Sequence, residues 1–210
     1  MRYPDAADGR WLRLVVKPKH LQMYVLRDQS SVGHLYDLYR PYSPLARWLF
    51  RAQLSLQRHL RAADPATAAP FDVALGRLDM APTAAAAVTS SWQGRIVVRA
   101  DTAGGEWFVK HGEANDQQLR NEGRFLLAIP AAQRRHFAEL RRFVDDAAGV
   151  TLVTRRLDVH RGRLPTVSDA LRAQDILASA DITHGDLNPQ NLIVDDDLGL
   201  APIFTQRVRP

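Results

Sequence analysis

One hairpin signal constrains the fold of this 210-residue chain more than any other feature of its sequence. The runs GRIVVRAD and GEWFVKHG are rich in β-branched and aromatic residues, and Ala103-Gly104-Gly105 between them is typical of a tight turn. AAAAVTSSWQ comes before this hairpin and predicts another strand. The middle of the chain is therefore expected to begin with three strands.

A helix and two further strands are expected to follow. EANDQQLRNEGRFLLAI has helical periodicity, and RRFVDD and VTLVTRRLDV have the composition of strands. A last helix is expected over residues 167–180, with Ser168 as its N-cap. This order of strands and helices indicates an α+β fold.

Residues 1–72 are interpreted as a leader region in front of that core. RWLRLVV and HLQMYVL predict two short strands, and residues 43–62 have the periodicity of a helix with an apolar face set against arginines. This helix fits either a membrane surface or packing against the neighbouring domain, and the second alternative is favoured. The last segment, ADPATAAPFD at residues 63–72, has the composition of a linker.

The composition of the chain excludes several classes of protein. Because the chain has no cysteine, it has neither a disulfide framework nor a cysteine-based metal site. The N-terminus lacks the apolar run of a signal peptide, and no segment approaches the ~20 apolar residues of a membrane span, so a cytoplasmic protein is expected. The net charge is +5, but the basic residues are scattered and do not alternate with aromatic residues. No nucleic-acid partner is therefore expected.

The candidate active-site residues lie in the string HGDLNPQN, from His184 to Asn191. Its pattern is His-x-Asp-x-x-x-x-Asn, and Pro189 excludes a helix between Asp186 and Asn191, so both lie on a loop. Phosphoryl transfer needs a carboxylate near the attacking hydroxyl and an oxygen ligand for magnesium. Asp186 and Asn191 suit these two roles, and His184 suits holding the loop backbone. The same residues also fit an ordinary Asx-rich turn, and Leu192-Ile193-Val194 predicts a buried strand that anchors the loop.

HGDLNPQNLIVDDD resembles the catalytic loop of the protein-kinase-like phosphotransferases. It is closest to their small-molecule branch, the aminoglycoside and choline kinases and the bacterial lipopolysaccharide sugar kinases, because Gly185 stands where protein kinases carry arginine. The resemblance implies a five-stranded N-lobe with one helix over residues 73–159 and a shortened C-lobe over residues 160–210. It also implies ATP and Mg²⁺ as cofactors, and a small polar or sugar acceptor as the second substrate.

The resemblance assigns a nucleotide-gripping lysine upstream of the loop. Members of the family carry a lysine on the third strand that contacts the α- and β-phosphates and pairs with a glutamate of the next helix. Lys110 ends the strand EWFVK, and Glu122 follows on the predicted helix. Glu113 is an alternative partner for Lys110.

The resemblance also implies contacts to the rest of the nucleotide. The phosphate-covering turn would lie at residues 89–94, where Ser90 and Ser91 are candidates to donate backbone N–H groups to phosphate. The same residues also fit an ordinary hairpin turn. Backbone groups of Thr154 and Arg155 are the candidates for meeting the adenine ring.

One part of the family's pattern is absent from this sequence. A second metal-binding aspartate is expected about a dozen residues after Asn191, where the string APIFTQ has Phe204 and Thr205 instead. The run Asp195-Asp196-Asp197 is interpreted as the solvated tip of a hairpin. Two hypotheses follow: an ATP-dependent phosphotransferase, or a pseudokinase or truncated remnant that binds nucleotide or a protein partner and transfers nothing.

Overall fold

The computed structural model describes most of the chain in nine segments. They cover residues 10–14, 21–27, 30–38, 44–56, 60–90, 94–156, 166–179, 192–195 and 199–202. The chain divides into two compact units, one formed by residues 1–116 with 142–153 and the other by residues 117–141 with 154–210. The sheet that carries Lys110 runs through the first unit.

An eight-stranded sheet organises the first unit. Its strands are β1 (Trp11–Leu14), β2 (Leu21–Leu26), β3 (Leu60–Ala62), β4 (Pro82–Ser90), β5 (Ile96–Thr102), β6 (Gly105–Gly112), β7 (Leu140–Asp146) and β8 (Gly149–Arg155). They follow the order β3-β1-β2-β4-β5-β6-β8-β7 across the sheet. The five strands expected over residues 73–159, β4 to β8, are all present, and β1 and β2 confirm the two strands expected before them. The sheet itself is larger than the expected five-stranded one. β1, β2 and β3 extend the sheet because β2 pairs antiparallel with β4, with Val25 opposite Ala86.

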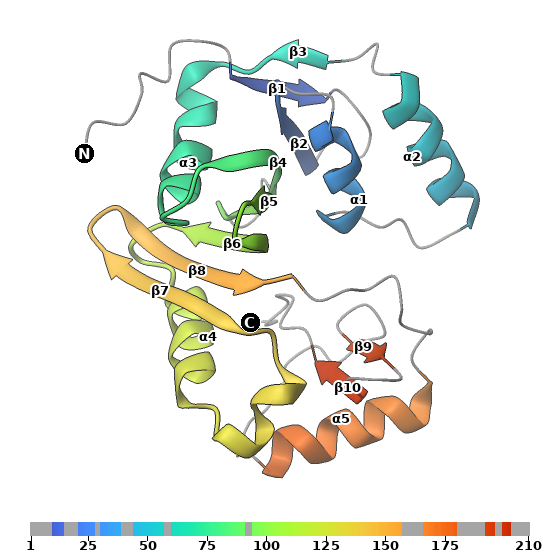
Figure 1. Cartoon of the computed structure of the whole chain (residues 1–210), viewed down its shortest axis with the longest axis vertical. Coiled ribbons are helices and arrows are strands. Elements are labelled where there is room, and N and C mark those ends of the chain that lie inside the picture. Colours follow the sequence, from blue (N-terminus) through green and yellow to red (C-terminus); the bar gives the residue numbers. More distant parts are fainter. Residues whose placement is uncertain are drawn as a thin grey trace. The chain divides into compact units, whose positions relative to one another are not determined.

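Helices cover both faces of this sheet. Figure 1 shows α3 (Pro65–Gly76) on one side of β4 and β5, and α1 (Leu35–Leu38) with α2 (Pro44–Leu56) on the other. Along β4, Ala85 and Ala87 belong to the core beneath α3, and Ala86 and Val88 belong to the core beneath α1 and α2. Side chains of successive strand residues point to opposite faces. The alanine run therefore forms a central strand whose short side chains let helices pack closely on both faces.

Helix α3 occupies the segment whose composition indicated a linker, so that interpretation is wrong. Asp64 is the N-cap, and its Oδ1 accepts a hydrogen bond from the backbone N–H of Ala66 at 2.8 Å. Pro65 stands in the first turn, where its missing N–H costs no hydrogen bond. Phe71 anchors the helix, with its ring centroid 4.6 Å from that of Tyr24. Pro65 thus starts a helix instead of ending one.

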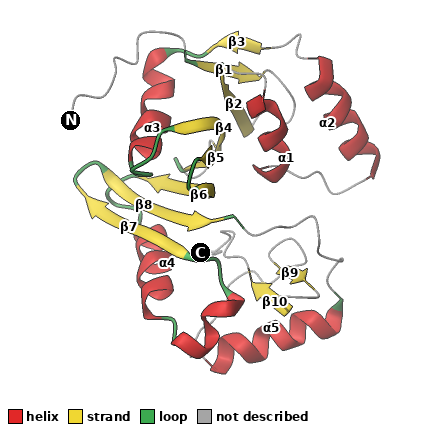
Figure 2. Cartoon of the chain, viewed as in Figure 1, coloured by secondary structure: helices red, strands yellow, loops and turns green. Residues whose placement is uncertain are grey.

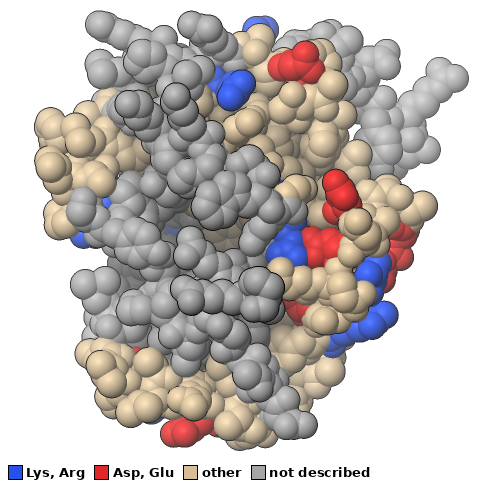
Figure 3. Space-filling model, turned by 180° about the vertical axis from the view of Figure 1, so that it is seen from behind, with Lys and Arg blue, Asp and Glu red and all other residues tan. Residues whose placement is uncertain are grey.

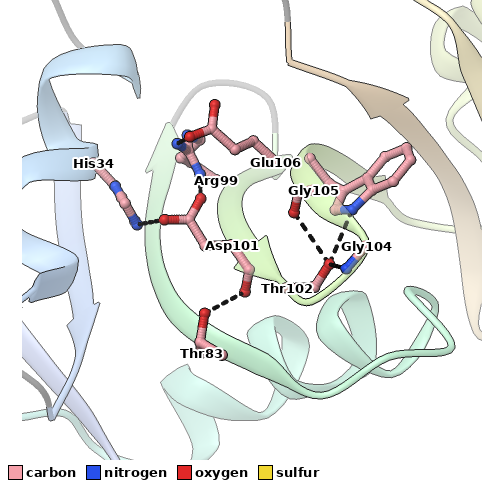
Figure 4. A network of polar contacts seen from close by, with 9 residues as sticks. His34, Thr83, Arg99, Asp101, Thr102, Gly104, Gly105 and Glu106 are labelled. Carbon is pink, nitrogen blue, oxygen red and sulfur yellow. Dashed lines mark hydrogen bonds and ion pairs between the residues drawn. The ribbon is translucent and has the colours of Figure 1, made fainter.

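The structure confirms the predicted hairpin between β5 and β6. Thr102 stabilises its turn. Thr102 pairs with Gly105, so Ala103 and Gly104 form the turn. The Thr102 hydroxyl accepts hydrogen bonds from the Gly104 N–H and from Trp107 Nε1, both at 3.1 Å, and donates one to the Gly105 carbonyl at 3.1 Å (Figure 4). The turn is therefore fixed by a side chain as well as by the strand pairing.

Gly149, the first residue of β8, is closely surrounded by atoms of neighbouring residues. Its φ is +129°, in the region that favours glycine. A Cβ at this position would overlap the carbonyl oxygen of Gly112 and lie 2.8 Å from Cε1 of His111. Both the backbone conformation and the lack of space therefore require glycine.

We expect Gly149→Ala to lower the free energy of unfolding by about 3 kcal/mol, because a positive φ and a backbone overlap act together. Gly105→Ala is the matched control. Gly105 also has a positive φ, +119°, but nothing lies within 4 Å of an added Cβ, so strain alone should cost about 1 kcal/mol. Urea unfolding followed by circular dichroism measures both variants. Equal losses would contradict the packing argument.

The second unit contains α4 (Gln117–Ala128), η3 (Ala131–His136), α5 (Val167–Ser179), β9 (Leu192–Asp195) and β10 (Gly199–Pro202). α4 confirms the helix predicted after the first three strands of the core. The second unit has a small core that is formed by Leu126, Ile129, Phe137 and Leu177. Gln133 of η3 donates a hydrogen bond to Ser179 Oγ at 2.9 Å. α5 contacts the β9–β10 hairpin, beside which it runs in Figure 2.

Helix α5 starts with a reciprocal cap that differs from the predicted one. The Asp169 carboxylate accepts from the backbone N–H of Thr166 at 2.8 Å, and the Thr166 hydroxyl accepts from the backbone N–H of Asp169 at 3.3 Å. This is the arrangement of a capping box. The N-cap is therefore Thr166, and the assignment to Ser168 is wrong because Ser168 lies within the first turn.

Candidate functional site

Lys110 lies near the end of β6 in a half-buried position. In the sheet register Val97 of β5 is opposite Lys110, and Val88 of β4 is opposite Val97. Val88 and Val97 belong to the core on the face away from α3. Because residues paired across a sheet share a face, Lys110 lies on that face too.

The connection between β4 and β5 lies at the same end of the sheet as Lys110. Ser90 ends β4 two residues beyond Val88, and β5 begins at Ile96. Ser91 lies outside the described residues. Gly94 has φ +61° just before β5, a conformation that glycine adopts without strain. The register thus brings Ser90 and Lys110 to one end of the sheet.

A buried ion pair holds this end of the sheet together. The side chains of Arg95 and Asp116 are only 8% and 9% exposed, and Nε and Nη2 of Arg95 donate to the two carboxylate oxygens of Asp116. Arg95 directly precedes β5, and Asp116 directly precedes α4. Gly112 leaves room for the carboxylate, because a Cβ there would overlap it. The pair therefore ties the segment after Lys110 to the β4–β5 connection.

His111, next to Lys110, fixes β6 against β8. Its ring is buried, and Nδ1 lies 2.8 Å from Thr151 Oγ1. Burial lowers the pKa of His111, the charge of Arg77 lowers it further, and Asp146 opposes the shift. Because the pKa is lower in the folded state, this histidine contributes stability that is full above its unfolded pKa of about 6.5. That contribution is lost as the pH falls below this value.

A second charged cluster lies on β5 and anchors η2 (Ser30–His34) to the sheet. Arg99 is 2% exposed and pairs with Asp101 and with Glu106, the latter at 3.2 Å. Asp101 Oδ2 lies 3.0 Å from His34 Nε2 (Figure 4). A buried guanidinium needs such partners because an unpaired buried charge is costly. Composition and periodicity gave no sign of this cluster or of the Arg95–Asp116 pair.

The other predicted nucleotide contacts lie in the second unit. Glu122 is half-buried on α4, Thr154 is buried near the end of β8, and Arg155 is exposed. The backbone N–H of Arg155 donates to the carbonyl of Glu139 at 2.9 Å, and their side chains form an exposed ion pair at 3.5 Å. Pairing of Glu122 with Lys110 stays a prediction, as do the adenine contacts of Thr154 and Arg155.

The alternative partner of Lys110 lies in the same unit as Lys110. Glu113 follows β6, and a Cβ added at Gly94 would come within 3.7 Å of its Oε1. Its carboxylate therefore lies beside the β4–β5 connection. Pairing of Glu113 with Lys110 stays a prediction, like that of Glu122.

The loop from His184 to Asn191 lies outside the described residues, so the roles of His184, Asp186 and Asn191 stay predictions. Strand β9 begins directly after Asn191 and confirms the strand predicted behind the loop. It pairs antiparallel with β10, with Asp195 opposite Gly199, and the interpretation of Asp195-Asp196-Asp197 as a solvated hairpin tip stays a prediction. Asp196, Asp197, Phe204 and Thr205 also lie outside the described residues.

The described residues contain neither a metal-binding cluster nor a helix that could span a membrane. Within that part of the chain, no group of three or more histidine, aspartate and glutamate side chains is arranged to hold a metal ion. No helix there has both the length and the apolar character that a bilayer crossing needs. Asn191, the predicted magnesium ligand, lies outside the described residues.

Comparison with solved structures returns a crystal structure of Rad53 1-466 in complex with AMP-PNP. The sequence identity is 18% and the TM-score is 0.38, with 52% of this chain covered. The chain spans about a third of the Rad53 chain, 34% of its length. A likeness at this level says nothing about the reaction of this chain. No family model and no curated protein matches the sequence.

Proposed function

We propose that this chain is an ATP-dependent phosphotransferase with a protein-kinase-like fold. It would belong to the small-molecule branch and transfer the γ-phosphate of ATP to a hydroxyl of a small polar or sugar acceptor in the cytoplasm. The observation that carries the proposal is the string HGDLNPQN directly ahead of β9, together with Lys110 on the strand before α4. The order β4-β5-β6-α4-β7-β8 supports it, because a nucleotide-gripping lysine is expected on the third strand of such a series.

The end of the sheet near Lys110 suits a polyphosphate. The cationic side chain lies on the same end as the β4–β5 connection, where a glycine at φ +61° leaves the backbone open to close approach. Backbone N–H groups in such turns bind anions. Lys110 would grip the α- and β-phosphates, and Ser90 and Ser91 would cover them. Glu122 would hold the lysine, and backbone groups of Thr154 and Arg155 would meet the adenine.

The loop residues would carry the transfer itself. Asp186 would orient the acceptor hydroxyl and remove its proton, and His184 would hold the loop backbone in place. Asn191 would be the magnesium ligand, and the bound ion would neutralise charge on the phosphates. Such catalysis consists mostly of positioning and charge stabilisation. These are tasks for side chains held on a loop between fixed elements.

A second candidate function rests on one sequence observation. Where the family's second metal-binding aspartate is expected, APIFTQ offers Phe204 and Thr205, and neither replaces a carboxylate at magnesium. A pseudokinase that binds nucleotide without transfer would have such a sequence. Asp186 and Asn191 favour the enzyme, because a decayed site is expected to lose them as well.

Nucleotide binding tests what the two candidates share. We expect Lys110→Met to weaken ATP binding about 10- to 100-fold, because a charged hydrogen bond to phosphate contributes about 1.5–3 kcal/mol. Isothermal titration calorimetry with and without Mg²⁺ measures this, with Lys17→Met as a control that removes an equal charge elsewhere. If the native chain binds no nucleotide under either condition, both candidates fail.

A further inference from the structure

Helix α2 packs on the sheet of the first unit through only one of its sides. Phe50 and Leu54 are each 3% exposed and belong to the core beneath the helix. The Phe50 ring meets the ring of Tyr36 edge-on, with centroids 5.5 Å apart. This confirms packing for the side of α2 that carries Phe50 and Leu54 and leaves the opposite side of the helix outside that contact.

Large apolar residues on the opposite side of α2 are exposed to solvent. Leu45, Trp48 and Leu49 are 67%, 64% and 48% exposed. Their spacing of three and four residues places them on one stripe, and a turn of about 100° per residue puts this stripe opposite Phe50 and Leu54. Single exposed apolar residues are ordinary, whereas a contiguous group that includes a tryptophan marks a contact surface. We name Leu45, Trp48 and Leu49 the outer stripe.

The sequence of α2 and of the residues that flank it carries charge of one sign. α2 contains Arg47 and Arg51 and no acidic residue, and the sequence from residue 38 to residue 63 contains five arginines and neither aspartate nor glutamate. The Arg51 guanidinium lies 5.6 Å from the ring centroid of Tyr36, which holds it at the flank of the helix. An anionic partner is therefore favoured over a neutral or basic one.

Several arginines elsewhere in the first unit are paired with carboxylates. Arg77 donates to Asp146 at 2.7 Å, and Arg142 pairs with Asp79. Toward the right of the view in Figure 3, basic and acidic side chains lie next to one another. The sequence around α2, which has arginines but no acidic residue, thus differs from these surfaces.

We propose that α2 docks the protein onto the surface of an anionic lipid bilayer. The outer stripe would enter the boundary between headgroups and acyl chains, where tryptophan is favoured, and Arg51 would meet the lipid phosphates at the flank. An apolar face with arginines and without acidic residues fits anionic lipid better than it fits the polar surface of an average protein. The proposal does not depend on the phosphotransferase function.

Vesicle binding by the full chain tests the proposal. Co-sedimentation is measured with vesicles of phosphatidylcholine alone and of phosphatidylcholine mixed with phosphatidylglycerol. We expect binding to the mixed vesicles that is at least about tenfold stronger than to the neutral ones and that weakens as salt rises. Failure to bind the mixed vesicles, or equal binding to both, would overturn it.

Matched variants locate the surface. We expect Trp48→Ser combined with Leu49→Ser, and separately Arg51→Glu, each to weaken binding on the order of tenfold. The controls are Leu127→Ser, which removes a 58% exposed leucine of α4, and Arg172→Glu on α5, and both should bind as the native chain does. Thermal unfolding confirms that each variant is folded, because exposed substitutions cost little stability.

Two further measurements distinguish lipid from a second copy of the protein as the partner of the outer stripe. Tryptophan fluorescence should shift to shorter wavelength on adding the mixed vesicles, and Trp48→Phe should remove most of the shift. Light scattering of the native chain without lipid reports self-association. A dimer that Trp48→Ser dissociates would assign the outer stripe to a second copy and overturn the lipid proposal.

Discussion

Asp186→Asn is expected to reduce phosphoryl transfer by about 10²- to 10⁴-fold while ATP binding stays within a factor of a few. Asparagine keeps the size of the side chain but accepts no proton, and a positioned general base contributes a rate factor of this order. ATP-to-ADP conversion, measured with a panel of polar and sugar acceptors, gives the rate. Calorimetry on the same samples gives the affinity, so that loss of catalysis is separated from loss of binding.

A neighbouring aspartate serves as the control for Asp186. Asp196→Asn removes one carboxylate of the acidic run behind β9, which is expected to lie at a hairpin bend. It should leave the rate unchanged. If the native chain converts no ATP but binds it, the pseudokinase function replaces the enzyme. Equal rates in Asp186→Asn and in the native chain would remove Asp186 from the chemistry.

Arg95→Ala is expected to lower the free energy of unfolding by about 3–5 kcal/mol, because it leaves the buried Asp116 carboxylate without its partner. Both side chains are more than nine-tenths buried, so water cannot replace the lost hydrogen bonds. Chemical unfolding in urea measures the loss. The same variant should also weaken ATP binding if the β4–β5 connection covers the phosphates, because the ion pair holds that connection.

Two comparisons test whether burial of the charge is the cause. Glu139→Ala breaks an ion pair with Arg155 whose side chains are 66% and 61% exposed, and it should cost at most about 1 kcal/mol. Combining Arg95→Met with Asp116→Leu removes both charges and should recover most of the stability lost in Arg95→Ala. A double variant as unstable as the single one would point to lost packing instead.

The core strands and the helix between them could be predicted because their signals are local. Alternating apolar residues, the glycine turn after Thr102 and the periodicity of α4 each lie within a short stretch of sequence. Helix α3 could not be read in the same way. Pro65 and Pro70 resemble linker residues, and only the capping contact of Asp64 and the burial of Phe71 make them compatible with a helix.

The candidate site also has features that the sequence predicts and features that only the structure reveals. The string at residues 184–191 and the place of Lys110 after two strands are visible in the sequence, and the register adds that Lys110 shares one end of the sheet with Ser90. The ion pair of Arg95 and Asp116 was missed because its partners are 21 residues apart and such charge pairs are common in any sequence. Pairing between side chains that are far apart in the sequence produces no periodic pattern from which it could be predicted.

The antiparallel joint between β2 and β4 has a consequence for any shortened form of this protein. A chain that began at residue 73 would leave the N–H and C=O groups of β4 unpaired along one side, with Ala86 and Val88 stripped of the helices above them. An open apolar strand edge recruits other copies of itself. Such a fragment should precipitate as sheet-rich aggregates, even though it would retain Lys110 and the whole stretch from His184 to Asn191.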